Sequence, residues 1–274
     1  MEIAPLGDSA FIVRVTIPED RPPGLSGQTA VPAVENRQRR ARRPSAVTGE
    51  TPVFRKCTPE QLLNHVLDAF RRIQDARIPG VIELAPAYTT VAVFFDPMRV
   101  IAAGAKPDRV FGFLAERVRK AISKTHKIRS SGKIEMRLIE IPVCYEAEFA
   151  LDLEQVSRQT QIDPIEVINL HRAAQYRVSC IGFTPGFPFL TGLHKRLATR
   201  RRSIPRKEIP AGAVAIAGAQ TGIYPMKSPG GWNIIGRTPL RLFDPQKSPP
   251  ALLHAGDRVC FRAITRSEFE ALKR

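Results

Sequence analysis

The segment from Tyr176 to Pro239 constrains the fold of this chain more than any other. It is rich in glycine and proline, yet it also carries Phe183, Phe187, Phe189, Tyr224 and the only tryptophan, Trp232. A disordered glycine- and proline-rich tract lacks such aromatic residues. The segment is therefore predicted to be folded, with tight turns at fixed places where a ligand can approach the backbone.

Four blocks in this segment read GFTPGFPFL, IPAGAVAIAG, TGIYP and SPGGWNIIGRTP. Further blocks are PLGDSAFIV near the start, GVIELAPAYTTVAVFFDP, IPVCYEAEFALDLEQVS, and LLHAGDRVCF near the end. In this order they resemble the signature blocks of the KipI / allophanate-hydrolase-subunit-1 family. Members of that family include the B subunit of ATP-dependent 5-oxoprolinase, and related sequence occurs in the carboxyltransferase part of urea carboxylase. The resemblance covers nearly the whole chain.

Composition bounds the possible partners. The chain has 274 residues, 43% of them hydrophobic, which suits one large domain or two of ordinary size. Its net charge of +16 is concentrated in two clusters, at 37–43 and 195–207. We interpret the first cluster as a solvated loop, so that nucleic acid is not favoured as a partner. The four cysteines lack metal-type spacing, and neither a signal peptide nor a membrane span is visible, which predicts a cytoplasmic protein with free thiols.

The first half of the chain, residues 1–130, is predicted to form a small α+β domain of the ferredoxin-like type. A strand is expected within 6–17 and strands at 81–84 and 89–95, with a turn at Ala85–Ala87 between the latter two. Thr58 begins a capping box for one helix, and Pro107 precedes a second. Residues 18–57 are interpreted as a flexible basic insertion.

Residues 131–274 are predicted to form a mostly-β barrel domain, with the boundary in the polar stretch 125–132. Strands are expected at 134–143, 176–183, 213–217, 232–236, 240–243 and 257–264. Asp152 and Asp163 are expected to cap two short helices, and a last helix is expected at 267–274. The family resemblance implies that the barrel is cyclophilin-like.

No phosphate loop, HExxH motif or GxSxG elbow is present, and no histidine has metal-ligand spacing. The absence of a self-sufficient catalytic set favours a site that is completed by partner subunits. The first candidate loop contains Pro185, Gly186 and Phe187, which could present amide groups and an aromatic wall to a small ligand. The alternative is a barrel corner whose phenylalanines fill the core.

The second candidate loop offers a hydroxyl, a side-chain amide, two aromatic rings and a glycine pair whose N–H groups could form an anion-binding nest. Its candidate residues are Tyr224, Ser228, Gly230, Gly231, Trp232 and Asn233. Arg206 and Arg237 are charged candidates, because guanidinium binds carboxylate or phosphate in a bidentate manner. The alternatives are a hairpin with Trp232 in the core and arginines in structural ion pairs. His171 matches a family histidine, although a lone histidine on an apolar helix is more often structural.

The resemblance implies a cytoplasmic component of 5-oxoprolinase that opens the cyclic amide of 5-oxoproline to glutamate, with ATP as co-substrate, Mg²⁺ expected with it and no tightly bound cofactor. The expected partners are homologues of the C subunit, which is of the allophanate-hydrolase-subunit-2 type, and of the A subunit. The chain is expected to be inactive alone. Two alternatives remain open at this point. One is a regulatory inhibitor of a sensor histidine kinase, as KipI-type members are, and the other is a carboxyltransferase piece of a urea carboxylase or allophanate hydrolase system.

Overall fold

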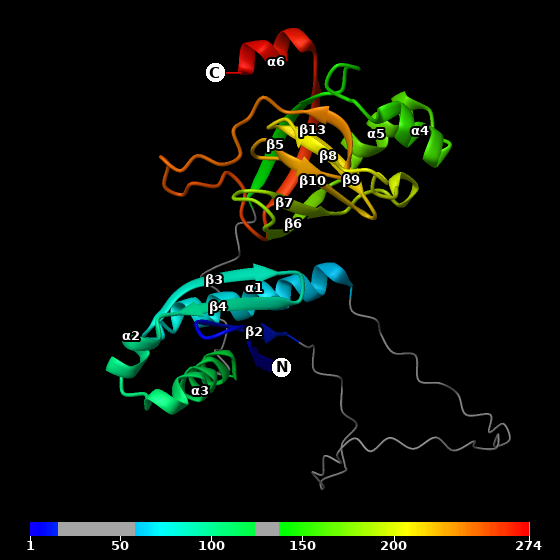
Figure 1. Cartoon of the computed structure of the whole chain (residues 1–274). Helices are drawn as coiled ribbons and strands as arrows, with labels where there is room; N and C mark the ends of the chain where they lie inside the picture. The colour runs from blue at the N-terminus through cyan, green and yellow to red at the C-terminus, as the bar shows by residue number, and fades with distance from the viewer. Residues whose placement is uncertain (16–57, 124–136, 274) are drawn as a thin grey trace, which may run out of the picture.

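A computed structural model describes residues 1–15, 58–123 and 137–273, which form two packed units (Figure 1). The first unit is a small sheet covered by helices, and the second is a closed barrel with helices beside it. The expected insertion at 18–57 and the expected boundary at 125–132 lie outside the described residues. The domain limits at residue 130 therefore stay a prediction.

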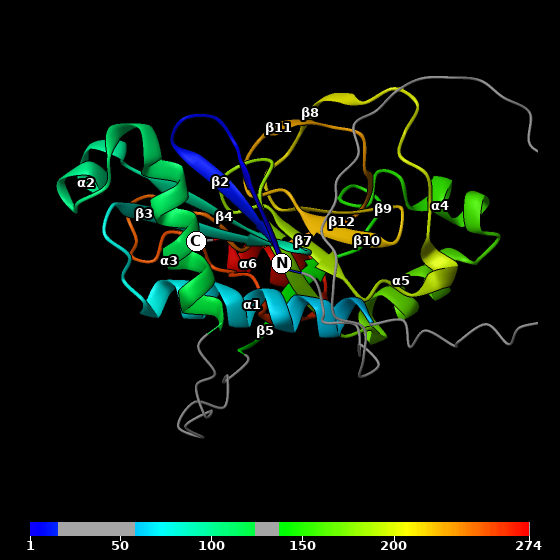
Figure 2. The same cartoon turned by 90° about the horizontal axis from the view of Figure 1, so that it is seen from below.

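The N-terminal unit is an antiparallel sheet in the order β1-β2-β4-β3. Its elements are β1 (Glu2–Pro5), β2 (Ala10–Arg14), α1 (Pro59–Asp75), β3 (Val81–Ala87), β4 (Thr90–Phe95), α2 (Pro97–Ala102), the 3-10 turn η1 (Pro107–Arg109) and α3 (Val110–Ser123). Helices α1 and α3 pack together beside the sheet (Figure 2). Their buried faces, represented by Val66 and Leu114, share one core with Phe11 and Val93 of the strands.

Local sequence explains where α1 begins. The Thr58 hydroxyl accepts from the Gln61 amide at 3.2 Å, and the Thr58 amide donates to the Gln61 side chain at 2.9 Å. Pro59 occupies the first turn, where its missing N–H needs no partner. The predicted capping box is confirmed.

One local prediction in this unit is wrong. Residues Ala85–Ala87 continue strand β3 instead of turning, because Pro86 pairs with Val91 across the hairpin. The turn lies at Tyr88, which has a positive φ of 41°. The strand expected within 6–17 is confirmed as β2, and β1 precedes it as the other strand of a hairpin. The ferredoxin-like assignment of this unit stays a prediction.

The second unit contains a closed barrel of seven strands in the order β6-β13-β5-β12-β9-β10-β7, with β7 pairing back to β6. The strands are β5 (Leu138–Cys144), β6 (Tyr176–Ile181), β7 (Pro188–Thr191), β9 (Ala213–Ala217), β10 (Gln220–Ile223), β12 (Asn233–Arg237) and β13 (Arg258–Ile264). A separate two-stranded ribbon joins β8 (Arg206–Ile209) to β11 (Ser228–Gly230). The predicted barrel is confirmed, whereas its cyclophilin-like type stays a prediction.

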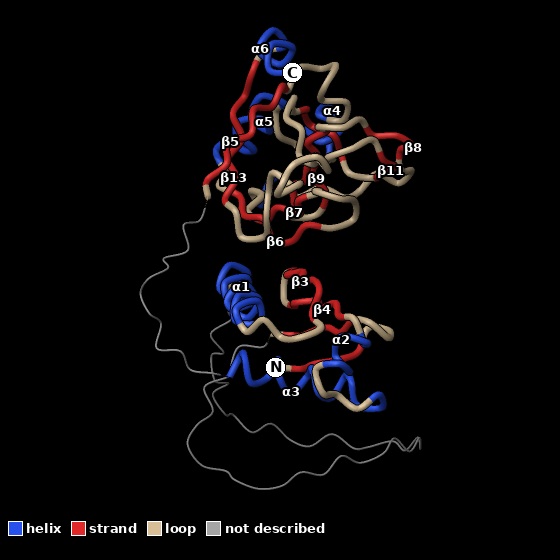
Figure 3. Tube along the Cα trace, turned by 90° about the vertical axis from the view of Figure 1, so that its left-hand side faces the viewer, coloured by secondary structure: helices blue, strands red, loops and turns tan. Residues whose placement is uncertain are grey.

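Helices α4 (Leu153–Thr160), α5 (Pro164–Ala173) and α6 (Arg266–Leu272) accompany the barrel, and η2 (Lys195–Leu197) is a short 3-10 turn. Figure 3 shows the helices of both units, in blue, beside their strands, in red. Asp163 caps α5 as predicted, accepting from the Ile165 amide at 2.8 Å. Asp152 precedes α4, but its side chain makes no capping bond. The strand expected at 240–243 is also absent, and only Phe243 forms an isolated bridge there.

The two units meet at the β3–β4 turn. Ala87 pairs with Cys180 of β6, and the Tyr88 amide donates to the Ser179 carbonyl at 3.2 Å. The Gln220 side chain donates to the Tyr88 hydroxyl at 2.8 Å. The small sheet is thereby continuous with the barrel wall at strand β6.

Candidate functional site

The first candidate loop connects β6 to β7 and is closed by its own backbone. The Gly182 amide donates to the Phe187 carbonyl at 3.1 Å, and the Phe187 amide donates to the Thr184 carbonyl at 3.0 Å. Phe183 is held at a positive φ of 68° with its ring exposed. The loop thus presents Phe183 outward while Phe187 turns into the protein.

The second candidate loop runs from β10 through β11 to β12. The Tyr224 amide donates to the Ala213 carbonyl at 2.9 Å, which ties the loop to β9. A Cβ atom at Gly230 would lie 2.3 Å from the Tyr224 hydroxyl, whereas one at Gly231 would meet nothing closer than 3.7 Å. Only glycine at 230 therefore lets the backbone pass the buried Tyr224 ring.

Together the two loops enclose a cavity of about 300 Å³, here called the aromatic cavity. Its lining residues are Phe183, Phe187, Phe189, Arg201, Pro205, Tyr224, Pro229, Gly230, Gly231 and Trp232. The rings meet edge to face, as between Phe187 and Trp232 (5.8 Å, 89°) and between Phe187 and Tyr224 (5.1 Å, 81°). The cavity combines apolar walls with the peptide groups of a glycine pair.

Arg201 is the one charged residue that lines the aromatic cavity among the described residues. Its guanidinium lies 6.0 Å from the Trp232 ring. Burial raises the pKa of Tyr224, while the Trp232 backbone and the charges of Arg201 and Arg206 act in the opposite direction. Tyr224 is consequently a neutral hydroxyl at physiological pH. Such a cavity suits a small, flat molecule that carries one negative charge.

Both alternatives for the loop aromatics hold at once. Phe187, Tyr224 and Trp232 are almost completely buried and belong to a core cluster with Ile209 and Ile234, yet their rings also line the cavity. Five of the twelve candidate residues meet at this place, namely Phe187, Tyr224, Gly230, Gly231 and Trp232.

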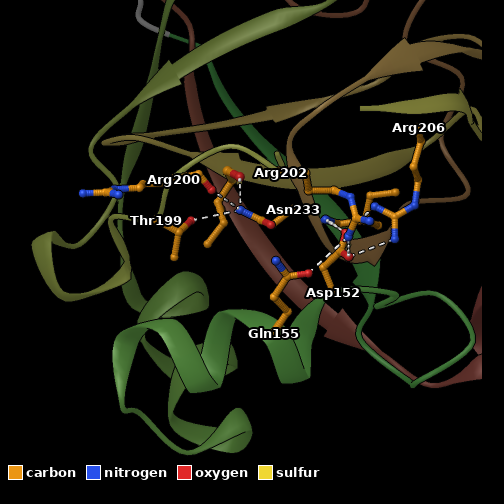
Figure 4. Close-up of polar contacts among 9 residues, drawn as sticks. Asp152, Gln155, Thr199, Arg200, Arg202, Arg206 and Asn233 are labelled. Carbon is orange, nitrogen blue, oxygen red and sulfur yellow. Dashed lines mark hydrogen bonds and ion pairs between the residues drawn. The ribbon is translucent and has the colours of Figure 1, made fainter. Parts of the chain in front are cut away.

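Arg206 lies in a buried ion network (Figure 4). Its two terminal nitrogens contact both carboxylate oxygens of Asp152 at 2.7 and 2.8 Å, and Arg202 contacts the same carboxylate at 2.6 Å. The Ile234 amide also donates to Asp152 at 2.8 Å. The geometry favours the structural alternative for Arg206. Asp152 joins strands β8 and β12 to the start of helix α4 instead of capping that helix.

His171 is completely buried behind the barrel wall. Its Nδ1 lies 2.9 Å from the Tyr145 hydroxyl and its Nε2 lies 3.1 Å from the Thr221 hydroxyl, while its ring stacks on Phe261 at 4.5 Å. Burial lowers the pKa of His171 to about 3, so the imidazole is neutral. These contacts favour the structural alternative for this residue.

The remaining candidates do not line the aromatic cavity. Asn233 is buried, and its side-chain amide donates to the Arg200 carbonyl at 2.8 Å. Gly186 packs against Phe243, Pro185 is exposed, and Ser228 lies in the β8–β11 ribbon. Arg237 lines a second hollow, which Pro225, Met226 and Phe269 of α6 also line.

Sequence reasoning missed Arg201 as a cavity residue. Arg200, Arg201 and Arg202 are adjacent and look alike in the sequence. Their roles separate because the side chains of these successive residues face different neighbours. Arg202 turns inward to Asp152, whereas Arg201 lies against Trp232.

Comparison with known proteins identifies the family. The carboxyltransferase domain family of subdomains C and D matches residues 43–253, and the chain belongs to this family. The family resemblance drawn from the sequence blocks is thereby confirmed.

Within the family, the chain is 44% identical to the 5-oxoprolinase B subunit of Bacillus subtilis (strain 168), over 78% of this chain and 88% of that protein. It is 36% identical to the 5-oxoprolinase B subunit of Escherichia coli O157:H7, over 78% and 92%. The crystal structure of TTHA0988 superposes with a TM-score of 0.62 at 35% identity, covering 76% of this chain. This chain spans 38% of the length of the TTHA0988 chain.

The described residues hold no helix that is long and apolar enough to cross a membrane. Within the same residues, no group of three or more His, Cys, Asp or Glu side chains is placed to hold a metal ion. Cys144, Cys180 and Cys260 are free thiols, and burial raises the pKa of each.

Proposed function

We propose that this chain is the B subunit of an ATP-dependent 5-oxoprolinase and that the aromatic cavity binds the cyclic amide. The observation that carries the proposal is a cavity with aromatic walls and one cation, Arg201, in a chain that is 44% identical to a 5-oxoprolinase B subunit. A five-membered lactam with a carboxylate is flat, small and singly charged. Its ring fits the aromatic walls, and its carboxylate fits the guanidinium.

The proposed reaction overcomes the poor electrophilicity of an amide. The lactam oxygen attacks the γ-phosphorus of ATP and ADP leaves, which gives a phosphorylated imidate. Water then adds to the activated carbon, the ring C–N bond breaks, and phosphate departs to leave glutamate. Backbone N–H groups near Gly230 and Gly231 would stabilise the negative charge of the phosphoryl group that is transferred to the lactam oxygen.

We propose that partner subunits complete the site. Two large apolar side chains close to the cavity are exposed, Phe183 at 62% and Ile204 at 77%. Exposed apolar side chains at the rim of a pocket are typical of protein interfaces. The partners would be homologues of the C and A subunits of 5-oxoprolinase, and a stable interface would bury roughly 1,600 Å² in total. On this proposal the chain is inactive alone.

The test is ATP-dependent glutamate release from 5-oxoproline by the chain alone and after coexpression with homologues of the C and A subunits. We expect release only from the complex. Arg201→Gln should raise KM for 5-oxoproline at least about tenfold, since it removes a charge-assisted bond. The matched control is Arg262→Gln, because Arg262 pairs with the exposed Glu140 and lines neither cavity.

Trp232→Phe is a better probe of the cavity wall than Trp232→Ala. Trp232 is only 6% exposed, and truncation of a buried tryptophan costs about 3–5 kcal/mol of stability. The phenylalanine variant keeps an apolar ring and should lose affinity for 5-oxoproline while the melting temperature changes little. Glutamate release by the isolated chain would refute the shared site, and no release from the complete complex would refute the proposed activity.

The finer structural and cellular assignments belong to the same proposal. Strand β2, helix α1, strands β3 and β4 and helix α3 follow the order of the first five elements of a ferredoxin-like unit. We propose that fold for the N-terminal unit, a cyclophilin-like type for the barrel, and a cytoplasmic location. The kinase-inhibitor and urea-carboxylase alternatives remain predictions that no contact in the site favours.

A further inference from the structure

A second hollow, here called the basic groove, has a volume of about 500 Å³ and lies beside the C-terminal helix α6. It is lined by four cations, Lys227, Arg237, Arg241 and Lys273, and by no carboxylate among the described residues. Apolar surface accompanies the charges, including Met226, Leu240, Phe243 and Phe269. The groove is therefore larger and more positive than the aromatic cavity.

Three of the cations have carboxylate neighbours outside the groove. Lys227 contacts Glu208 at 2.7 Å, Arg241 contacts Asp244 at 3.4 Å, and Lys273 contacts Glu270 at 3.6 Å. All three cationic side chains are more than half exposed. Exposed ion pairs of this kind contribute little, so a more highly charged ligand can replace the carboxylates.

Arg237 differs from the other three cations. Its Nε donates to the Ala211 carbonyl at 2.8 Å, and its guanidinium lies 5.9 Å from the Phe269 ring. No carboxylate of the described residues lines the groove beside it. The guanidinium is thus oriented by backbone and ring contacts while its terminal N–H groups remain for a ligand.

The backbone beside Arg237 is shaped by a glycine. Gly212 has a positive φ of 82°, and a Cβ atom there would lie 2.2 Å from the Thr238 carbonyl oxygen. Any larger residue would push this wall of the groove apart. The close approach keeps Ala211 in position to orient Arg237.

We propose that the basic groove binds the phosphate groups of a nucleoside triphosphate. One carboxylate is matched by one cation, whereas four cations along one groove match a chain of several charges. Arg237 would hold one phosphate with its planar fork, and the lysines and Arg241 would act as further charges. The apolar lining residues offer surface to the nucleoside. Naming ATP as that triphosphate rests on the proposed function.

The two hollows share one loop. Tyr224 lines the aromatic cavity, and its chain neighbours Pro225 and Met226 line the basic groove. The two ligands would therefore lie next to each other along this loop, as transfer of the γ-phosphoryl group to the lactam oxygen requires. The proposal assigns separate recognition sites for the two substrates to one chain.

The experiment measures binding of ATP and of inorganic tripolyphosphate to the full-length chain by calorimetry at two salt concentrations. We expect both to bind, to compete with each other and to weaken as salt rises. Arg237→Gln should weaken both by about tenfold or more, while the control Arg262→Gln should change them by less than about twofold. If Arg237→Gln does not fold, Lys227→Gln and Arg241→Gln replace exposed side chains, and each should weaken binding by about threefold.

The proposal is overturned if the chain binds neither probe, or if the groove variants bind as tightly as Arg262→Gln. Glutamate release from 5-oxoproline is measured separately. If the chain does not bind triphosphate but its complex releases glutamate, the groove is refuted and the proposed function stands. If triphosphate binding depends on Arg237 but the complex releases no glutamate, the groove stands and the proposed function is refuted.

Discussion

Asp152 is the carboxylate whose removal should most affect the stability of the barrel unit. The side chain is 2% exposed and accepts bonds from Arg202, from Arg206 and from the Ile234 amide. Asp152→Asn keeps the size and one acceptor oxygen. It removes the charge and turns an NH₂ group toward guanidinium groups that are themselves donors only.

The expected size follows from the burial of the network. Removing one partner of a buried ion pair costs about 3–5 kcal/mol, because the other charges stay behind without compensation. A domain has a free energy of unfolding of about 5–15 kcal/mol, so this loss is a large share of its stability. Arg206→Met should cost less, about 1–2 kcal/mol, because Arg202 and the Ile234 amide still hold Asp152.

Urea unfolding followed by tryptophan fluorescence measures this directly. Trp232 is the only tryptophan, and it lies two residues before Ile234. Asp163→Asn is the matched control, because Asp163 is an exposed N-cap and asparagine caps as well as aspartate. We expect the free energy of unfolding to fall most in Asp152→Asn, less in Arg206→Met and by nearly zero in Asp163→Asn. An Asp152→Asn loss below about 1 kcal/mol would refute the argument that this charge is required.

Three further predictions concern pH, a glycine and the insertion. Because burial lowers the pKa of His171 to about 3, the unfolded chain binds a proton below about pH 6.5 that the folded chain does not. The free energy of unfolding should therefore fall by about 2 kcal/mol more from pH 7 to 5 in the wild type than in His171→Gln. Urea titrations that show the same pH dependence of this free energy in both proteins would contradict the prediction. Gly230→Ala should displace the Tyr224 ring and weaken 5-oxoproline binding, whereas Gly231→Ala should not; equal affinities by calorimetry would count against the cavity. Deletion of Pro22–Thr51, outside the described residues, should leave a soluble, folded chain, and an insoluble product would show that the segment packs.

Helix ends were predictable from the sequence because their signals are local. Thr58 and Asp163 cap the helices that follow them. Asp96 is likewise followed by a proline and caps helix α2. This six-residue helix was not predicted, because it is too short to show a periodic apolar face. Asp152 carries a capping residue type as well, but its carboxylate is taken by arginines 50 and 54 positions away.

Short strands and charged site residues were less predictable. Strands β7 and β10 have four residues each and lie among glycines and prolines, so only their pairing partners in the closed barrel define them. The two candidate loops were found because their composition is unusual. Which arginine faces which cavity depends on contacts between distant segments, and no local pattern separates Arg201, Arg206 and Arg237.

The position of strand β13 in the barrel bears on how the chain folds during synthesis. β13 is the last strand to be made, and it lies between β6 and β5, the first two strands of the barrel unit. Its pairing joins Leu138 to Arg258, a large separation along the chain. Closure of loops of this length is slow relative to local folding. The N-terminal unit can fold early on the ribosome, whereas β5 and β6 keep unpaired edges until Ile264 has emerged, and the barrel closes only then.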